Sequence, residues 1–358
     1  MIKELIVHLG DTKTGSTTLQ GVLKEEAYRL PEGKSLLYPG KGLNHNHLPR
    51  SLSHKKEAER ADHRFKGIFR AFKGSDDDFA VVSAENFQGV DPERLQEKIA
   101  AHWPGLEDRM RLISYVRPHA EKLLSSFAEQ TKFGRAPGGV QQFYKQMSRH
   151  GTLDYVPRFR KWKAVFGERF ELRPFVRSEL YQQDVVQDFF QFLLRGPGAQ
   201  IQDIAVANTS PSVAQIALLR KVHEAFLGDR DRSAGPRELA VLGRLLFAEF
   251  RKVGLGSDSG KLLIPSPMMG EFTKRYREDA ATLDAEFFAG TPMSDALRAA
   301  PEKLSGPLQP LKAEAYFSEE TIRAIEVLSS LLGQLGEHDS KTFYGLARGL
   351  LDTQRHKI

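Results

Sequence analysis

The chain has 358 residues, 40% hydrophobic and 27% charged, which is typical of a globular protein with one large or two ordinary domains. Its formal net charge of +6 favours anionic ligands such as nucleotides, polyanionic glycans or nucleic acid, without separating them. There is no cysteine, which excludes disulfides, thiolate nucleophiles and cysteine-ligated metals.

The first apolar stretch, at residues 5–9, is far too short for a signal peptide or a membrane span. No later stretch approaches the ~20 apolar residues that a membrane-spanning helix needs. We therefore expect a cytoplasmic, bacterial protein with no integral membrane segment.

Five short apolar runs predict the strands of one sheet. They lie at residues 5–9, 35–38, 79–83, 111–116 and 170–175, and segments with helical spacing separate them. This alternation is typical of βαβ units, so we expect an α/β fold with a P-loop-like parallel β-sheet flanked by helices. After residue 178 the apolar spacing predicts a mainly helical C-terminal portion. We expect residues 1–194 to form the ligand-binding core and residues 195–358 to form a helical portion of the same domain.

The loop after the first strand has the most specific pattern. Residues 10–18 read GDTKTGSTT, and the apolar spacing from Leu19 to Leu30 predicts a helix after them. A glycine-bearing turn between a buried strand and a helix directs backbone N–H groups and the helix dipole at one place, which suits a phosphate. The alternative is a turn whose glycines serve packing only.

The pattern departs from that of a nucleotide triphosphatase loop, G-x-x-x-x-G-K-[ST]. Gly10, Gly15 and Thr17 keep their positions, but Ser16 stands where the lysine belongs, and the lysine is at position 13. The lysine of a triphosphatase serves the β- and γ-phosphates beside magnesium, so its displacement argues against ATP or GTP hydrolysis.

The run from Lys13 to Thr18 resembles the 5′-phosphosulfate loop of sulfotransferases that use 3′-phosphoadenosine 5′-phosphosulfate (PAPS), in particular the bacterial carbohydrate-type members. The resemblance implies that Lys13 contacts the oxygen bridging the 5′-phosphate and the sulfate. It also assigns the rest of the loop to the 5′-phosphate: Thr14, Gly15, Ser16, Thr17 and Thr18.

A second anchor follows the fourth predicted strand. Arg117 leaves this strand, and Ser125 lies eight positions later, the spacing at which the family holds the 3′-phosphate of the donor. An arginine fork matches a phosphate and keeps its charge at any working pH. The resemblance covers residues 2–194 and is thin beyond residue 199, so the PAPS-binding core is expected at 1–194.

The reaction needs a base near the acceptor hydroxyl and positive charge near the leaving group, which Lys13 can supply. Members of the family use a histidine or a glutamate as the base. The candidates are Glu85, at the end of the third predicted strand, and His47 or His45 in a polar loop. A metal bound by this histidine loop is disfavoured, because no carboxylate lies at helical spacing among the histidines.

The expected function is sulfuryl transfer from PAPS, with PAP as the product and no metal, to a hydroxyl of a carbohydrate or glycolipid. A small-molecule acceptor, a lipid-linked sugar and a polysaccharide all stay open. Trp103, Tyr155 and Trp162 are candidates for stacking on sugar rings, with core packing as the alternative. A basic run at residues 50–70 could meet an acidic glycan or be an ordinary exposed helix face. No nucleic-acid partner is expected, and a homodimer stays open. The alternatives are a P-loop-like kinase and a non-enzymatic polyanion-binding module.

Overall fold

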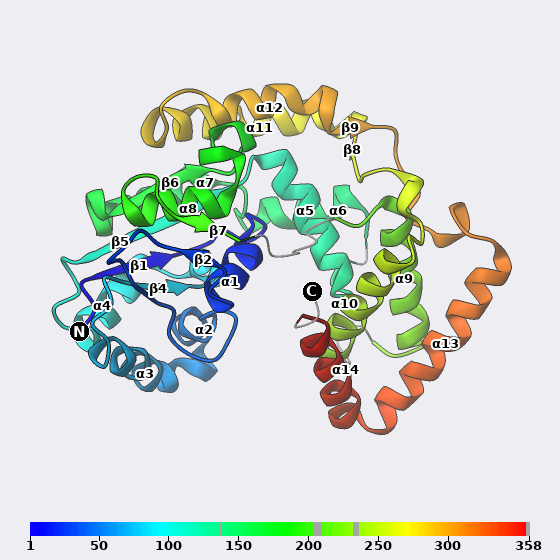
Figure 1. Ribbon diagram of the computed structural model, residues 1–358. Coiled ribbons are helices and arrows are strands. Elements are labelled where there is room, and N and C mark those ends of the chain that lie inside the picture. The colour runs from blue at the N-terminus through cyan, green and yellow to red at the C-terminus, as the bar shows by residue number, and fades with distance from the viewer. Residues whose placement is uncertain (137, 203–209, 232–235, 356–358) are drawn as a thin grey trace. The chain divides into compact units, whose positions relative to one another are not determined.

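The computed structural model describes residues 1–136, 138–202, 210–231 and 236–355 (Figure 1). The chain divides into two compact units. Unit 1 comprises residues 1–119, 154–208 and 276–297, and unit 2 comprises residues 120–153, 209–275 and 298–358. Each is described by itself.

An all-parallel sheet of five strands forms the centre of unit 1, in the order β3-β4-β1-β5-β6. The strands are β1 Glu4–His8, β3 Leu36–Leu37, β4 Phe79–Ser83, β5 Met110–Val116 and β6 Phe170–Pro174. Each lies where an apolar run predicts a strand, so the predicted α/β fold with a parallel sheet is confirmed.

Four two-residue strands were not predicted, because so short a segment shows no periodicity. They pair as β2 Tyr28–Arg29 with β7 Gln200–Ile201, and β8 Ile264–Pro265 with β9 Ser305–Gly306. The first pair shortens the helix expected to reach Leu30. That helix, α1, ends at Lys24, and Glu26 takes a left-handed φ of 51° before β2 begins.

The helices of unit 1 surround the sheet. Those wholly within it are α1 Ser16–Lys24, α2 His47–Ser53, α3 Ala61–Lys73, α4 Pro92–His102, α7 Tyr155–Phe166 and α8 Val185–Leu194. Three others are shared with unit 2: α5 His119–Lys132, α11 Ser266–Phe287 and α12 Pro292–Lys303.

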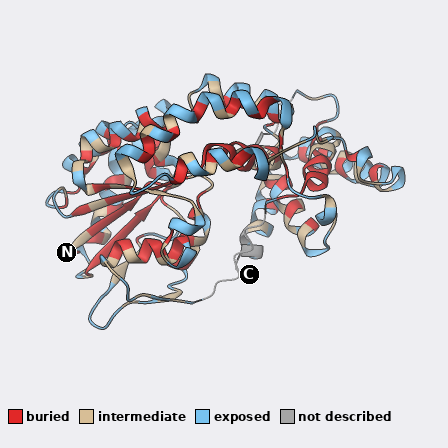
Figure 2. Cartoon of the chain, turned by 90° about the horizontal axis from the view of Figure 1, so that it is seen from above, coloured by how far each residue is buried: buried red, intermediate tan, exposed pale blue. Residues whose placement is uncertain are grey.

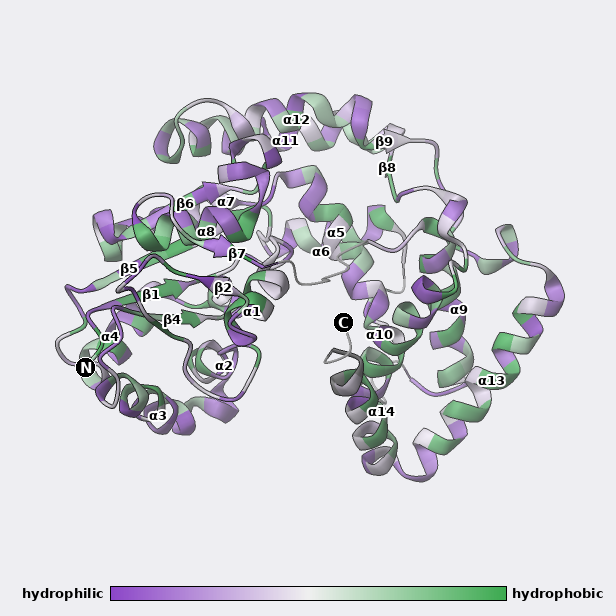
Figure 3. Cartoon of the chain, viewed as in Figure 1, coloured by the Kyte–Doolittle hydropathy of each residue, from purple (hydrophilic) through white to green (hydrophobic). Residues whose placement is uncertain are grey.

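The core of unit 1 follows from the alternation of side chains along buried strands. Ile6, Val81 and Ile113 lie in one cluster with apolar residues of α1 and α8, such as Leu19 and Phe189. Helices α3 and α4 pack together, and the indole N–H of Trp103, the residue after α4, donates to Phe65 O at 2.9 Å. Figure 2 shows the buried strands between helices that expose their outer sides, and Figure 3 shows the same strands as hydrophobic.

In its described residues, unit 2 contains helices joined by loops and the two-residue strands β8 and β9. Its remaining helices are α6 Val140–Arg149, α9 Val213–Leu227, α10 Pro236–Lys252, α13 Glu319–His338 and α14 Ser340–Arg355. Helix α9 starts with a capping box of Ser212 and Gln215 and buries Leu218 and Phe226 against α10 and α13. The mainly helical C-terminal portion is thereby confirmed.

None of the helices in the described residues combines the length and apolarity needed to cross a bilayer.

The strand order places the candidate loop at a particular point of the sheet. After β1 the chain builds β3 and β4 on one side, and then crosses to build β5 and β6 on the other. The carboxyl ends of β1 and β5, which are neighbours, therefore border the point where the winding changes direction. Open α/β sheets bind ligands at this point.

Two buried histidines make the fold sensitive to acid. Burial lowers the pKa of His8 from 6.5 to about 3 and that of His45 to about 4. The unfolded chain would protonate both near pH ~6.5, so below that pH it binds more protons than the fold. The free energy of unfolding should therefore fall as the pH drops from about 6.5 toward 4.

Urea unfolding at pH 7, 6 and 5 tests this expectation. His45→Gln should flatten the pH dependence by up to ~1.4 kcal/mol per pH unit, because one titrating group is removed. Replacing His63 by Gln is the matched control for the loss of one imidazole, because His63 is exposed in the fold. An unaltered slope in His45→Gln would contradict the assignment.

Candidate functional site

Three strands end together at Gly10. Its φ is +93°, and a Cβ added there would lie 2.8 Å from the Cα of Glu85, just after β4. Its carbonyl accepts hydrogen bonds from the Tyr115 N–H at 2.7 Å and the Ser114 hydroxyl at 2.9 Å, both on β5. Only glycine tolerates both this φ and this approach, so Gly10 joins the carboxyl ends of β1, β4 and β5.

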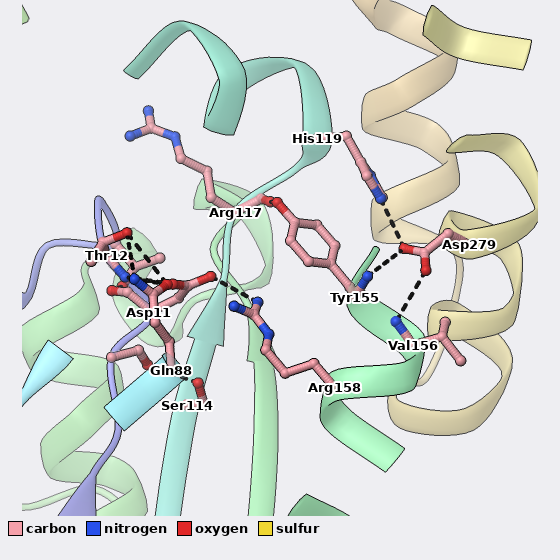
Figure 4. A network of polar contacts seen from close by, with 12 residues as sticks. Asp11, Thr12, Gln88, Ser114, Arg117, His119, Tyr155, Val156, Arg158 and Asp279 are labelled. Carbon is pink, nitrogen blue, oxygen red and sulfur yellow. Dashed lines mark hydrogen bonds and ion pairs between the residues drawn. The ribbon is translucent and has the colours of Figure 1, made fainter. Parts of the chain in front are cut away.

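Asp11 organises the loop from inside. Its side chain is fully buried: Oδ1 accepts from the Thr12 N–H at 2.7 Å, and Oδ2 pairs with the Arg158 guanidinium at 2.9 Å. Its carbonyl accepts from the hydroxyls of Thr14 at 2.6 Å and Ser16 at 3.2 Å. Figure 4 shows Arg158 reaching from α7 to this carboxylate. The hydroxyls of the loop and the distant Arg158 cation therefore both help to fix its shape.

The loop opens into the N-terminus of α1. Gly15 is the N-cap, with φ +78° and no side chain to cap the helix, and the first turn carries no acidic residue. A helix leaves its first N–H groups without acceptors inside the helix, and its dipole makes this end positive. Thr17 is exposed and Thr18 is half-buried at this end. The first turn of α1 has the geometry and the polarity to hold an anion.

The two predicted cationic anchors are in direct contact. Lys13 has a left-handed φ of 69°, and its carbonyl accepts a hydrogen bond from the Arg117 guanidinium at 2.9 Å. Arg117 lies over the Phe175 ring at 5.5 Å, and its carbonyl accepts from the Tyr155 hydroxyl at 2.9 Å. A guanidinium has five N–H groups, so it can hold a carbonyl and an anion together.

The candidate bases also share one edge. Glu85 is half-buried and begins a 3₁₀ turn, Glu85–Gly89, directly after β4. The Asn86 N–H donates to the Asn46 side-chain oxygen at 3.2 Å, and His47 follows Asn46 as the first residue of α2. Glu85 and His47 therefore lie on two segments that hydrogen bonds join.

The geometry separates the two histidines. His45 is buried, its Nε2 lies 2.7 Å from Pro39 O, and its Nδ1 accepts from the Ser83 N–H at 3.1 Å. Both nitrogens are thus engaged with backbone, and His45 fastens its loop to β4. His47 is exposed as a residue, but its ring is partly shielded from water. This desolvation lowers the pKa of His47, and the nearby Arg64 cation lowers it further. At neutral pH its imidazole is neutral and can accept a proton.

Ser125 lies in unit 2, on α5. Its buried hydroxyl donates to Lys122 O at 3.2 Å. Its pairing with Arg117 at a 3′-phosphate stays a prediction.

Sequence reasoning missed three residues of the loop's surroundings: Asp11, Gln88 and Arg158. The Gln88 amide donates to the Thr12 hydroxyl at 3.2 Å. For Arg158 a signal existed, because it shares the apolar face of α7 with Tyr155 and Trp162 at helical spacing. A charged side chain on a buried face needs a partner of opposite charge, which here is Asp11.

A carboxylate far along the chain caps α7. Asp279 of α11 accepts from the N–H groups of Tyr155 at 3.2 Å and Val156 at 3.0 Å, and from the ring of His119 at 2.9 Å (Figure 4). These contacts satisfy first-turn N–H groups that the N-cap residue, Asp154, leaves open. They hold the helix that carries Arg158.

Other candidates are placed differently. Trp103, Tyr155 and Trp162 are buried, so the core alternative to sugar stacking is confirmed. Among the described residues, no three His, Asp or Glu side chains gather as a metal-binding group. A hollow of about 660 Å³ lies at the opposite, amino-terminal edge of the sheet, but charges in its lining pair with each other, as in Lys3–Asp78 and Arg111–Glu4.

Comparison with models of known protein families and with curated proteins finds no match. The function is therefore argued from the residues of this chain.

The environment of His47 can be tested by substitution of Arg64. Arg64→Gln removes a cation beside the ring, so the pKa of His47 should rise toward its usual value of 6.5. NMR titration of the His47 ring measures the shift. Arg50→Gln is the control, since Arg50 shares the partner Glu57 but is not among the groups that lower this pKa. An unchanged or lower pKa in Arg64→Gln would show that Arg64 does not act on His47.

Proposed function

We propose that this chain is a PAPS-dependent sulfotransferase that acts on a carbohydrate hydroxyl. The observation that carries the proposal is the contact between Arg117 and the Lys13 carbonyl at the mouth of the α1 N-terminus. It brings the Arg117 guanidinium, the backbone of Lys13 and a set of helix N–H groups together at the switch point of a parallel sheet. A donor with two phosphate positions and a sulfate calls for several cationic groups of this kind.

In the proposed reaction the acceptor oxygen attacks the sulfur of the donor. His47 or Glu85 takes the hydroxyl proton, an S–O bond forms to the acceptor, and the S–O bond to the 5′-phosphate breaks. The electron pair leaves on the phosphate oxygen of PAP. Lys13 and the first turn of α1 would stabilise the charge that grows there.

The arrangement also keeps the candidate bases apart from the groups that would stabilise the leaving phosphate. Lys13 and α1 belong to the end of β1, while Glu85 and His47 belong to segments beside β4. Because β1 and β4 are neighbours, the leaving group and the acceptor can lie over adjacent strands. A neutral imidazole at His47 could act as a base without further tuning.

A thermal-shift screen with PAP, PAPS, ATP and GTP tests the class of ligand. A nucleotide that binds only the fold raises its stability by ~2.7 kcal/mol at a hundredfold excess over Kd. PAP and PAPS should raise Tm by several degrees, whereas ATP and GTP should not. Adenosine 5′-phosphosulfate should bind about ten- to a hundredfold more weakly than PAPS, since it lacks the 3′-phosphate assigned to Arg117. Stabilisation by ATP with magnesium but not by PAP would favour the kinase alternative.

Lys13→Ala should act on rate more than on binding, because the charge it meets grows toward the transition state. We expect kcat to fall by about 10²–10³, the loss typical of one preorganised electrostatic donor, while PAP affinity changes only modestly. Turnover of labelled PAPS in the presence of EDTA measures this for both proteins. Lys24→Ala, at the other end of α1, is the control and should keep full turnover. If EDTA abolishes transfer and magnesium restores it, the assignment of Lys13 is wrong.

A further inference from the structure

One segment of the chain is strongly basic and largely exposed. Residues 55–73 carry seven Lys and Arg against three acids, a net charge of +4, while the whole chain has +6. This segment is the 3₁₀ helix η1, Lys55–Arg60, followed by α3. Its exposed cations are here called the α3 basic surface: Lys55, Lys56, Arg60, Lys66, Arg70 and Lys73.

The cations of this surface are not held in ion pairs within the described part of the chain. Within the described chain none of the six is in an ion pair, and two of the three acids of the segment are already bound. Glu57 pairs with Arg50 and Arg64, and Asp62 pairs with Lys98 of α4. Unpaired cations in a row create a potential that attracts polyanions.

The geometry of α3 makes the surface linear. Lys66, Arg70 and Lys73 lie at i, i+4 and i+7, which is one face of a helix, and 13 residues of helix extend ~20 Å. The opposite face carries Phe65, Ile68 and Phe72, all buried in unit 1. A ligand bound along α3 therefore meets a straight row of cations on a helix whose opposite face packs into the core of unit 1.

The row begins beside a candidate base. Arg64, in the first turn of α3, donates to the carbonyl of His47 at 2.6 Å. Helix α3 then runs away from the carboxyl edge of the sheet, since the Phe72 carbonyl accepts from the N–H of Ile2, just before β1. A chain bound along α3 would thus present one end near His47.

We propose that the α3 basic surface docks an acidic polysaccharide whose hydroxyl is the acceptor. That the bound glycan is the acceptor rests on the proposed function, while docking itself does not. A membrane is disfavoured because the apolar face of α3 is buried and cannot insert. Single-stranded nucleic acid is disfavoured because the surface offers no exposed aromatic for base stacking, as Phe69 is half-buried under Lys73.

Binding without nucleotide tests the surface directly. Fluorescent dextran sulfate, uncharged dextran and poly(dT) are titrated against the whole chain over a range of salt. Wild type should bind dextran sulfate and not dextran. The triple variant Lys66→Gln, Arg70→Gln, Lys73→Gln should bind about tenfold or more weakly at low salt, and its log K against log salt slope should be shallower by about 2, near 0.7 per lost cation.

A second triple variant makes the comparison specific. Lys145→Gln, Arg149→Gln and Lys274→Gln remove the same charge from exposed helical sites on α6 and α11. This control should stay within about threefold of wild type, and both variants should keep Tm, since exposed substitutions usually change stability by less than ~0.5 kcal/mol. Equal losses in the two variants, or equal binding of dextran and dextran sulfate, would overturn the proposal. Tighter binding of poly(dT) would replace it with a nucleic-acid surface.

The nucleotide screen separates this proposal from the function. If PAP fails to stabilise any variant while the α3 basic surface still binds dextran sulfate, the sulfotransferase assignment fails and the docking surface stands. If PAP stabilises both triple variants as it does wild type but neither differs from wild type toward dextran sulfate, the docking surface fails alone.

Discussion

The candidate site depends on the close approach of backbone at Gly10. Without a side chain there, the turn after β4 lies against the end of β1, while the Gly10 carbonyl is bonded to β5. A Cβ at this position would overlap the backbone of Glu85, which cannot move without displacing β4. This contact sets the distance between the loop that we propose binds a donor and the segment that carries a candidate base. The spacing of the two roles is therefore a property of the sheet.

A buried charge then fixes the shape of the loop. The Asp11 carboxylate is out of contact with water, and an unpaired ion in such a place costs several kcal/mol. The Arg158 cation offsets that cost, and Arg158 is in turn held on a helix whose first N–H groups are bound by Asp279. Loop, α7 and α11 are thus linked by charge within unit 1. A change in any of them would alter the direction of the loop hydroxyls.

The cations of unit 1 serve two different purposes. Those inside the fold, such as Arg158 and Arg64, are bound to carboxylates or carbonyls and position backbone. Those on η1 and α3 face water, and those near the α1 N-terminus lie at the carboxyl edge of the sheet. A transferase for an acidic acceptor would use the last two groups for its two substrates, with His47 beside the first turn of α3. The division explains why net charge alone could not distinguish among anionic partners.

The sequence by itself determined the sheet and the location of the loop. Strands such as 79–83 are buried on both faces, so their continuous apolar runs are visible without any tertiary information. The glycines at positions 10 and 15 mark the turn because backbone conformation there depends on the residue itself. The displaced lysine at position 13 is likewise a local fact. Features of this kind can be recognised from one short segment of the sequence.

The tertiary structure alone decided which residues meet. Arg117 and Lys13 are 104 positions apart, and Arg158 and Asp11 are 147 apart, so no local spacing connects them. The different environments of His45 and His47 were also decided by the tertiary structure, because the two histidines look equivalent in the chain. Only the approach of Ser83 and Pro39 engages one ring with backbone, while the other stays exposed. The hydrogen-bond partners and the burial of a residue depend on segments that the fold brings together from distant parts of the chain. The roles that follow from these contacts could therefore not be predicted from the sequence.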